Sequence, residues 1–573
     1  MSGGVNLLCQ HLEGYSNRGL RKRDFPPAMY IQQPWWEEYE KFNTAMSREG
    51  MILAESEKCV DVLVLHPQTT AWTLYDNGKC EGLKELNDRF IDTLDVLAKK
   101  HIQYHLGDET LIKRHARIEN GKFVIGNCKY SYIVDPGCEI LMQKTRELLD
   151  EFLSSGGKLL TVEELPDNNF TDNPEITYSL RQGDGYRVHY FVNTSPDEKK
   201  ANIFAKGKKL DIYSGDLLPF SGVHTFEPWG SLMIIEDGSE NIHYEEKKED
   251  FVYLDGEFEV FGEVENALTL DRCDYYFDGE LQDKNAFVLN ILHRANKLKR
   301  EVKIHQDYHV NVEFIPDKLY LVCETPENFD IFVNGTEIEK NIDGYFRDKS
   351  FKKIEISKYM KMGENTISFD GLFSQSPEVY ENIEKSAKFE SEKNKLYYDM
   401  EIEAIYLVGD FGVKTDGKWS ELERNAMRYR GEFVISEPVK KISLQNIEKQ
   451  GYAFFSDKMT VLGEIDIKGE NPVLCLRRKG INVVKIEIGG KESTLITNDK
   501  LSLLGLSGKT KVKVTLINNL RNLLGPHHLE VGESYQVSPA IFYEEPCIWN
   551  DGGWGYNPEK DWNSDYCFVQ TSL

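Results

Sequence analysis

The sequence contains few cysteines, no long apolar run and no signal peptide. Its ten cysteines are too sparse in 573 residues for a disulfide scaffold, and none forms a C-x-x-C pair, which excludes a zinc knuckle or a dithiol redox motif. No stretch approaches the roughly 18 consecutive apolar residues of a membrane-spanning helix. The first ten residues lack the basic and apolar regions of a secretory signal. We therefore expect a soluble cytoplasmic protein with buried free thiols.

The sequence also has fewer basic than acidic residues. The chain has 69 Lys+Arg against 95 Asp+Glu and a formal net charge of −26. Binding to nucleic acid through its phosphates requires a basic surface, so nucleic acid is excluded as a partner class. With 40% hydrophobic and 29% charged residues, the composition is that of a folded globular protein, and the length suggests about four domains.

Residues 56–168 alternate between short apolar runs and amphipathic stretches. The run 60–65 is stopped by His66-Pro67, as a buried parallel strand is, and apolar residues between 83 and 97 follow at steps of three and four. Strand-like runs at 102–106, 130–134 and 158–162 and a helical pattern at 140–152 continue the alternation. This order predicts a doubly wound parallel sheet.

From about residue 170 onward, short β runs recur at intervals of roughly ten residues, which is typical of all-β sandwiches. Phe329–Val333 runs into an Asn-Gly turn, and 511–516 alternates between polar and apolar residues. The acidic stretch 236–250 is predicted to be a linker. The remaining β region is too long for one sandwich, so we expect at least two.

The first fifty residues combine a strand-like run with polar and aromatic residues. Val5–Gln10 reads as a strand, and Trp35-Trp36 opens a helical pattern. Between them lie His11, Glu13, Tyr15, three arginines and Asp24. Such residues behind the carboxyl end of a parallel strand are typical of the active-site rim of an α/β barrel. The alternative is a solvated loop held by arginine–carboxylate pairs.

Several runs resemble those of large multidomain glycoside hydrolases, above all the α-L-rhamnosidase-like enzymes. The N-terminal runs 4–11, 18–27 and 35–36 resemble the last barrel strand and helix, and 61–67 resembles the start of an amidotransferase-like domain. Strand signatures of a galactose-binding-type jelly roll and further shared runs are found at 266–271, 331–335, 348–351, 363–367, 405–411 and 520–528. The resemblance implies a carbohydrate-active protein.

The resemblance also implies a division into five segments. The fold class is multidomain α/β plus all-β, with a barrel-end segment, a doubly wound amidotransferase-like domain and then β-sandwich or jelly-roll domains. The segments are 1–55, the last strand and helix of a catalytic barrel; 56–168, the amidotransferase-like domain; 169–245, a small β-sandwich; 246–385, a galactose-binding-like jelly roll; and 386–573, a second such sandwich with a C-terminal tail.

This chain has only about 50 residues for a barrel that needs about 250. It is therefore expected to be the C-terminal part of a longer enzyme, or a subunit that completes its barrel with another chain or a second copy of itself. Its partner is an oligo- or polysaccharide. The alternative is a non-catalytic carbohydrate-binding or assembly protein.

The candidate site residues lie in the N-terminal segment. Glu13 and Asp24 are the candidate catalytic carboxylates, because glycoside hydrolysis needs acid and base groups. Their alternative is a structural ion pair with a nearby arginine. The candidate substrate-binding residues are His11, which can hydrogen-bond a sugar hydroxyl, Arg21, and Trp35 and Trp36, which can stack on a sugar face. Packing at the start of the helix is the competing interpretation for both tryptophans.

No cofactor or metal ligand set is predicted. Cys128 and Cys138 lack the partners of a nucleophilic cysteine and are interpreted as structural. His527, His528 and Glu530 do not complete a metal site. The aromatic tail after residue 549 allows a sugar or structural calcium site, although a terminal segment more often wraps a neighbouring domain.

Overall fold

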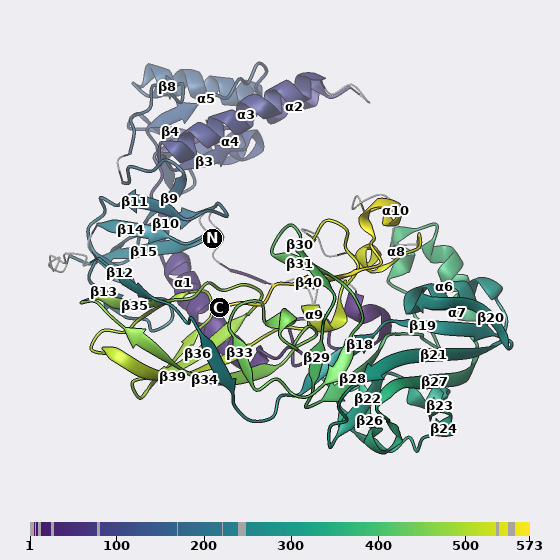
Figure 1. Cartoon of the computed structure of the whole chain (residues 1–573). Coiled ribbons are helices and arrows are strands. Elements are labelled where there is room, and N and C mark those ends of the chain that lie inside the picture. Colours follow the sequence, from purple (N-terminus) through teal and green to yellow (C-terminus); the bar gives the residue numbers. More distant parts are fainter. Residues whose placement is uncertain are drawn as a thin grey trace. The chain divides into compact units, whose positions relative to one another are not determined.

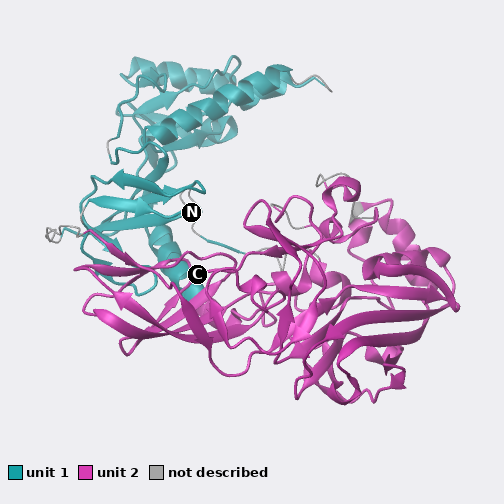
Figure 2. Ribbon diagram, viewed as in Figure 1, with its two compact units in different colours: residues 1–9, 41–247 teal, residues 10–40, 248–573 magenta. Residues whose placement is uncertain are grey.

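The computed structural model describes residues 5, 7–9, 13–23, 28–76, 81–168, 170–220, 222–238, 248–534, 538–547 and 556–573. The chain divides into two compact units (Figure 2). Unit 1 contains residues 1–9 and 41–247, and unit 2 contains residues 10–40 and 248–573. Within the described ranges, no helix is both long and apolar enough to cross a membrane.

Unit 1 contains the predicted parallel sheet. Its four strands are all parallel (Figure 1) and lie in the spatial order β3 (Tyr104–Gly107), β2 (Val62–Leu65), β7 (Tyr132–Val134) and β8 (Lys158–Leu160). The first strand in sequence therefore lies inside the sheet, as in doubly wound folds. Its helices are α2 (Gln68–Leu74), α3 (Glu81–Lys99), α4 (Glu109–His115) and α5 (Gln143–Ser154).

Helices cover both faces of this sheet. Successive side chains of a strand point to opposite faces, so one strand contacts the helices on both sides. Leu63 and Leu65 of β2 pack in a cluster with Leu148 and Phe152 of α5. The intervening valines, 62 and 64, pack in a second cluster with Leu97 of α3. The doubly wound arrangement predicted for this segment is thus confirmed. Its assignment as an amidotransferase-like domain stays a prediction.

The rest of unit 1 is largely antiparallel. A hairpin sheet follows α4 and consists of β4 (Ala116–Glu119), β5 (Lys122–Ile125) and β6 (Cys128–Tyr130). A six-stranded sheet has the order β1 (Glu57–Lys58), β9 (Ile176–Gln182), β10 (Arg187–Asn193), β15 (Ser231–Glu236), β12 (Lys208–Leu210) and β13 (Leu217–Leu218). A ribbon of β11 (Lys199–Asn202) and β14 (Val223–Phe226) packs with it.

Unit 2 contains two sandwiches, and the first is a pair of sheets; its assignment as a galactose-binding-like jelly roll stays a prediction. One sheet has the order β18 (Asn266–Leu270), β28 (Ile405–Gly409), β22 (Leu319–Cys323), β26 (Lys352–Glu355) and β25 (Ile342–Tyr345). The other includes β20 (Glu280–Phe287), β19 (Arg272–Phe277), β21 (Val302–Val312), β27 (Gly363–Phe373), β23 (Asp330–Val333) and β24 (Thr336–Glu337). Strand β32 (Val434–Ser436) pairs with β21, and β29 (Gly412–Lys414) pairs with β32.

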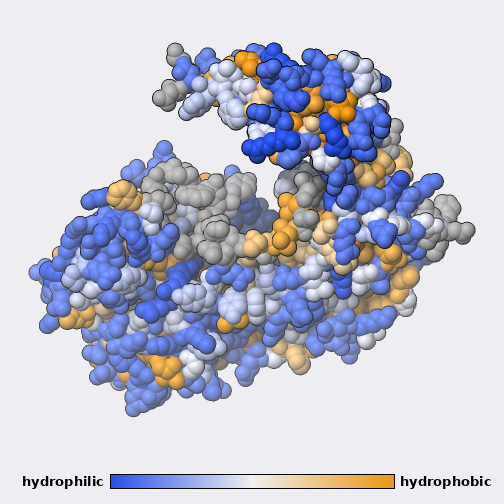
Figure 3. All heavy atoms as spheres, turned by 180° about the vertical axis from the view of Figure 1, so that it is seen from behind, coloured by the Kyte–Doolittle hydropathy of each residue, from blue (hydrophilic) through white to orange (hydrophobic). Residues whose placement is uncertain are grey.

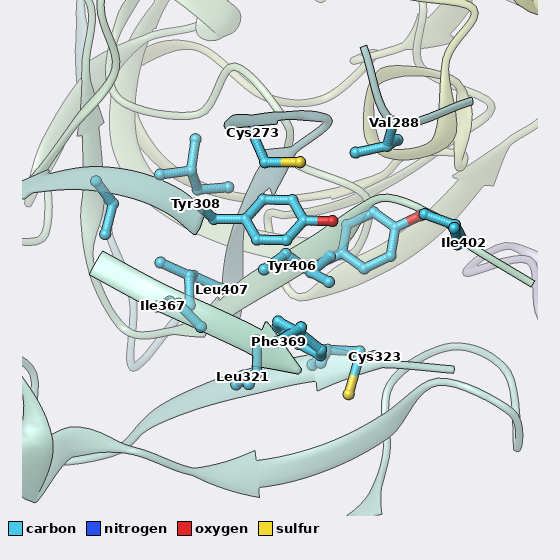
Figure 4. Packing of buried hydrophobic residues seen from close by; sticks show 14 of the residues in the cluster. Cys273, Val288, Tyr308, Leu321, Cys323, Ile367, Phe369, Ile402, Tyr406 and Leu407 are labelled. Atoms are coloured by element: carbon cyan, nitrogen blue, oxygen red, sulfur yellow. The ribbon is translucent and has the colours of Figure 1, made fainter. Parts of the chain in front are cut away.

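The two sheets of this sandwich enclose the largest core of the molecule. Figure 4 shows Tyr308 of β21, Phe369 of β27 and Leu407 of β28 within it. Along β21, residues alternate between this buried face and a polar outer face. Helix α6 (Val288–Leu298) adds Ile291 and Ala295 to the same core, and α7 (Pro377–Ser386) and α8 (Glu390–Lys393) follow β27.

The second sandwich has its own core. Its larger sheet consists of β33 (Lys441–Ser443), β17 (Glu257–Val260), β34 (Lys458–Ile467), β39 (Gly508–Ile517), β36 (Val483–Ile488) and β37 (Lys491–Leu495), and its smaller one of β16 (Asp250–Val252), β35 (Pro472–Cys475) and β38 (Lys500–Ser502). A further sheet contains β30 (Lys418–Glu421), β31 (Ala426–Arg430) and β40 (Tyr566–Val569). Strands β16 and β17 thus pair with strands about 200 residues later in the sequence.

The N-terminal segment differs from its predicted form. The predicted strand over Val5–Gln10 is not observed among its described residues, since Val5 and Leu7–Cys9 lie outside any helix or strand and are exposed. Without a neighbouring strand, its backbone has no ladder to join. The predicted helix is present: η2 (Trp36–Glu38) leads into α1 (Tyr39–Glu55).

The surface agrees with the acidic, hydrophilic composition. Figure 3 shows hydrophilic residues over most of the visible face of each unit, with apolar residues in small scattered groups. Single exposed apolar residues are normal on a folded protein and mark no binding site by themselves.

Candidate functional site

Unit 2 has a polar cleft of about 600 Å³, within the size range of ligand pockets. It lies where β18, β19, β20, β21 and β27 meet the loop after β31 and the segment before β40. Its polar and charged lining residues are Thr269, Asp271, Arg272, Asn285, His309, Asn311, Glu364, Asn365, Thr366, Glu432, Ser564 and Asp565.

Two paired strands supply one wall of the cleft. In the antiparallel register of β21 and β27, His309 lies opposite Thr366, and Asn311 lies opposite Glu364. Residues two apart on a strand share a face, so these four side chains form one polar patch. The His309 Nδ1 and Thr366 Oγ1 atoms are 3.4 Å apart. The same strands place alternate apolar residues in the core, which fixes the patch on the outer face.

Asp271 lines the cleft and is a buried carboxylate that hydrogen-bonds two other side chains. The Tyr566 hydroxyl donates to its Oδ1 atom at 2.5 Å, and His528 Nε2 lies 3.2 Å from its Oδ2 atom. Burial alone would raise the pKa of Asp271, but the hydrogen bond and charge of His528 outweigh it and hold that pKa below its usual range. Both carboxylate oxygens are therefore already engaged within the protein.

His527, next to His528 in the sequence, is a second buried histidine near Asp271. His527 is buried, and burial lowers its pKa to about 4 despite the nearby Asp271 carboxylate. Its Nε2 atom lies 2.9 Å from the Asn522 carbonyl oxygen. His527 is thus a neutral structural group at neutral pH, and its bond to Asn522 lies within the 520–528 segment.

Arg272 offers an unused donor in the cleft. Its Nη1 atom donates to the Asn285 carbonyl oxygen at 3.2 Å, whereas its buried Nη2 atom has no hydrogen-bond partner among the described residues. Register shifts between Cys273 and Tyr276 interrupt the pairing of β19 with β20, and Asn285 has a φ of +50°. Such bulges re-aim side chains beside binding sites.

Aromatic side chains complete the lining. Phe433 and Tyr566 line the cleft with ring centroids 4.8 Å apart, and Tyr429 lies 5.0 Å from Phe433. Aromatic rings can pack on the apolar face of a sugar, while the surrounding amides, carboxylates and Arg272 bind hydroxyl groups. The arrangement is suited to binding a polyhydroxylated ligand.

The described members of the predicted catalytic and binding set do not line this cleft. Glu13 and Arg21 are exposed, and the Arg21 guanidinium lies 6.0 Å from the Tyr15 ring centroid. His11 and Asp24 lie outside the described residues. The pairing of Glu13 with Asp24 therefore stays a prediction.

The two predicted tryptophans pack within an aromatic group. Trp36 lies 5.0 Å from Tyr30 and 5.7 Å from Tyr39, and Trp35 lies 5.5 Å from Tyr39, measured between ring centroids. Both indoles are half-buried. This is the packing interpretation made from the sequence, although part of each ring stays accessible.

Sequence reasoning did not select the cleft residues, but it contained a signal for them. Three of the runs that carry the family resemblance meet here: Thr269 Oγ1 donates to the Leu523 carbonyl at 2.9 Å, and Asn266 Nδ2 donates to the Phe411 carbonyl at 2.8 Å. Of these contact residues, Thr269 lines the cleft. The outer-face residues of β21 and β27 carried no such signal.

Comparisons with known proteins give distant likenesses alone. No protein-family profile and no curated protein matches the chain. Among solved structures, a rhamnosidase from Novosphingobium sp. PP1Y is similar over 66% of this chain and 41% of its own, with 12% identity and a TM-score of 0.27. A GH42 β-galactosidase from G. stearothermophilus is similar over 35% of this chain and 43% of its own, with 9% identity and a TM-score of 0.26.

A β-galactosidase from Bacillus circulans sp. alkalophilus is similar over 35% of this chain and 45% of its own, with 10% identity and a TM-score of 0.27. The chain thus spans less than half the length of each of these glycoside hydrolases. At such TM-scores and identities, the likeness carries no conclusion about the reaction or the substrate.

Proposed function

We propose that the chain is a carbohydrate-active protein, the C-terminal portion or a subunit of a glycoside hydrolase that cleaves complex glycans, with α-L-rhamnosides as the specific candidates. The observation that carries this proposal is the polar cleft of unit 2. Its aromatic lining, its unpaired Arg272 donor and its row of amide and carboxylate groups are the chemistry that binds sugars. The sequence resemblance points to the same class.

In this proposal, cleavage takes place in the N-terminal segment rather than in the cleft. Glu13, with Asp24 as the second choice, serves as one catalytic carboxylate there, and His11, Arg21, Trp35 and Trp36 contact substrate. The exposure of Glu13 fits a residue that needs a second polypeptide to form an enclosed site. That second polypeptide supplies the missing barrel strands and the remaining acid or base group.

The binding part of the proposal is tested by isothermal titration of the full chain with a panel of oligosaccharides, including rhamnosides. Arg272→Ala removes the unpaired donor and should weaken the affinity about tenfold or more. Arg117→Ala is the matched control, because that arginine is exposed in unit 1 and pairs with Glu119 alone. Equal affinities for both variants and the parent would exclude the cleft as the sugar site.

A second candidate function is a non-catalytic carbohydrate-binding or assembly protein. It is favoured by the full engagement of Asp271, which leaves this buried carboxylate unavailable for proton transfer. Turnover of aryl glycosides separates the two functions. The chain alone should show little or none, and the addition of the polypeptide that completes the barrel should produce turnover that Glu13→Gln abolishes.

A further inference from the structure

Residues 13–23 contact a group of acidic residues in unit 2, here called the acidic docking site and consisting of Glu324, Asp348, Glu401 and Glu403. Glu324 directly follows β22, and Glu401 and Glu403 directly precede β28. Because these two strands are antiparallel neighbours, with Val322 opposite Tyr406, the three glutamates gather at one end of the five-stranded sheet. Glu324, Asp348 and Glu401 are buried, and the Glu403 side chain is 6% exposed.

Two cations of the N-terminal segment enter this site. Arg23 forms a two-pronged pair with Glu403, with Nη1 and Nη2 each 2.6 Å from one carboxylate oxygen. The Lys22 ammonium lies 3.0 Å from Glu403 and also bonds Glu324. Both side chains are 3% exposed. Planar two-pronged pairs are the strongest and most geometrically selective contacts that arginine makes.

The backbone of the segment is recognised as well as its side chains. The Gly19 amide donates to Glu324 Oε2 at 2.7 Å, and the Asn17 amide donates to Asp348 Oδ2 at 2.7 Å. Gly19 has a φ of +51°, and a Cβ atom there would lie 1.9 Å from the Glu401 carboxylate, which Arg18 Nε bonds at 3.3 Å. The site therefore selects for glycine at this position as well as for the basic residues.

The segment is bound as a peptide ligand would be. Residues 13–23 form no β-bridge with any described strand, and their regular structure is one 3₁₀ turn, Gly19–Arg23. The attachment consists of ion pairs and two backbone donors rather than a shared sheet. Burial raises the pKa of Glu324 even though Lys22 opposes the shift, so removal of the segment would raise that pKa further.

We propose that the acidic docking site is a peptide-recognition site that binds the sequence Asn-Arg-Gly-x-x-Lys-Arg, and that a separate peptide of residues 13–23 binds it in place of the chain's own segment. The partner chemistry is a basic peptide with one obligatory glycine. Asn17, Arg18, Gly19, Lys22 and Arg23 supply the recognised groups, whereas the Leu20 and Arg21 side chains form no hydrogen bond or ion pair with the four described carboxylates of the site.

The test uses the full chain with residues 24–27 replaced by a specific protease site, cleaved after folding. A fluorescent peptide of residues 13–23 should exchange into the cleaved protein and bind the uncleaved chain at least about 100-fold more weakly, because the attached segment occupies the site there. Glu403→Gln in the cleaved chain should reduce binding by about the same factor. Equal binding to cleaved and uncleaved protein, or no binding to either, would overturn the proposal.

Peptide variants test the recognition itself. Gly19→Ala should weaken binding about tenfold, since it introduces left-handed strain and displaces the Glu401 carboxylate. Gly14→Ala is the matched control, because its added Cβ atom would meet no atom closer than 3.9 Å. Equal losses for the two peptides would contradict sequence-specific recognition.

A second measurement does not depend on the inserted protease site. In the intact chain, trypsin should cut after Lys22 and Arg23 at least about ten times faster in the Gly19→Ala variant than in the Gly14→Ala variant. Identical cleavage rates in both variants would show that Gly19 has no part in docking and would also overturn the proposal.

Discussion

At the scale of single residues, the buried carboxyl group of Glu448 makes the stability of the fold depend on pH. Its Oε2 atom accepts a hydrogen bond from the Thr571 amide at 2.9 Å, while Oε1 has no partner among the described residues. Burial raises its pKa to about 7. A carboxyl group whose folded pKa lies above its unfolded value stabilises the fold at low pH, and this contribution is lost as the pH rises through about 7.

Glu448→Gln should therefore make the chain more stable at pH 8 by on the order of 3 kcal/mol and leave it nearly unchanged at pH 4.5. The amide keeps an acceptor for Thr571 and carries no charge to be buried. Urea unfolding at the two pH values measures the difference. Exposed Glu437 provides the control substitution to Gln, and an equal response of both variants would contradict the assignment.

The cysteines of unit 1 give a second residue-scale prediction. Burial and the neighbouring Asp135 carboxylate raise the pKa of the Cys138 thiol, so little thiolate forms there. Cys128 is exposed. Iodoacetamide at pH 8 should alkylate Cys128 many times faster than Cys138, as mapped by mass spectrometry. Preferential labelling of Cys138 would revive a nucleophilic role for it.

At the scale of elements, the end of α1 is fixed by a buried arginine. Arg181 on β9 donates from Nη2 to the Leu53 carbonyl at 2.6 Å and from Nε to Ser56 Oγ at 2.9 Å. A cation next to the carbonyls at a helix C-terminus satisfies acceptors that the helix itself leaves unpaired. The contact also joins α1 to the six-stranded sheet of unit 1.

Arg181→Met should lower the free energy of unfolding of unit 1 by about 2 kcal/mol, because the carbonyls at the end of α1 lose their charged donor. Arg187→Met is the matched control on the next strand, since its guanidinium is exposed and bonds Gln182 at 3.3 Å. Differential scanning calorimetry compares the two. A larger loss for the control would show that α1 is fixed by other contacts.

The sequence predicted local elements better than their partners. The run 60–65 was recognisable as a central strand, because every residue of β2 is buried and only a strand covered on both faces is apolar throughout. In contrast, nothing in the short pattern of β16 or β17 indicates pairing with β35 and β34. The cleft was not predicted for the same reason. One of its walls forms only when β21 pairs with β27, and the sequence does not indicate that pairing.

At the scale of the whole molecule, residues 13–40 connect the two sandwiches of unit 2. Lys22 and Arg23 bind carboxylates of the first sandwich. Further along, the buried Glu38 carboxylate lies 2.5 Å from the Lys485 ammonium on β36, and Glu37 pairs with Lys458 on β34 of the second sandwich. One short segment thus forms ion pairs with both sandwiches.

Deletion of residues 1–40 should destabilise unit 2 far more than the parallel sheet of unit 1. The deletion leaves three buried glutamates and Lys485 without their partners, which is costly in a low-dielectric interior. Hydrogen-exchange mass spectrometry should show at least tenfold faster exchange in β22, β28 and β36, with β2 unchanged. Unchanged protection in the unit 2 strands would mean that the segment is dispensable for the fold.

The same segment has a consequence for recombination. Codons 13–40 specify the cations that neutralise glutamates encoded by codons 324, 401 and 403. A crossover between codons 40 and 248 would join the main body of unit 2 to N-terminal residues from another parent, and unmatched parents would give offspring with unbalanced buried charge. We therefore expect the two stretches of the gene to be inherited as a linked pair, although unit 1 is encoded between them.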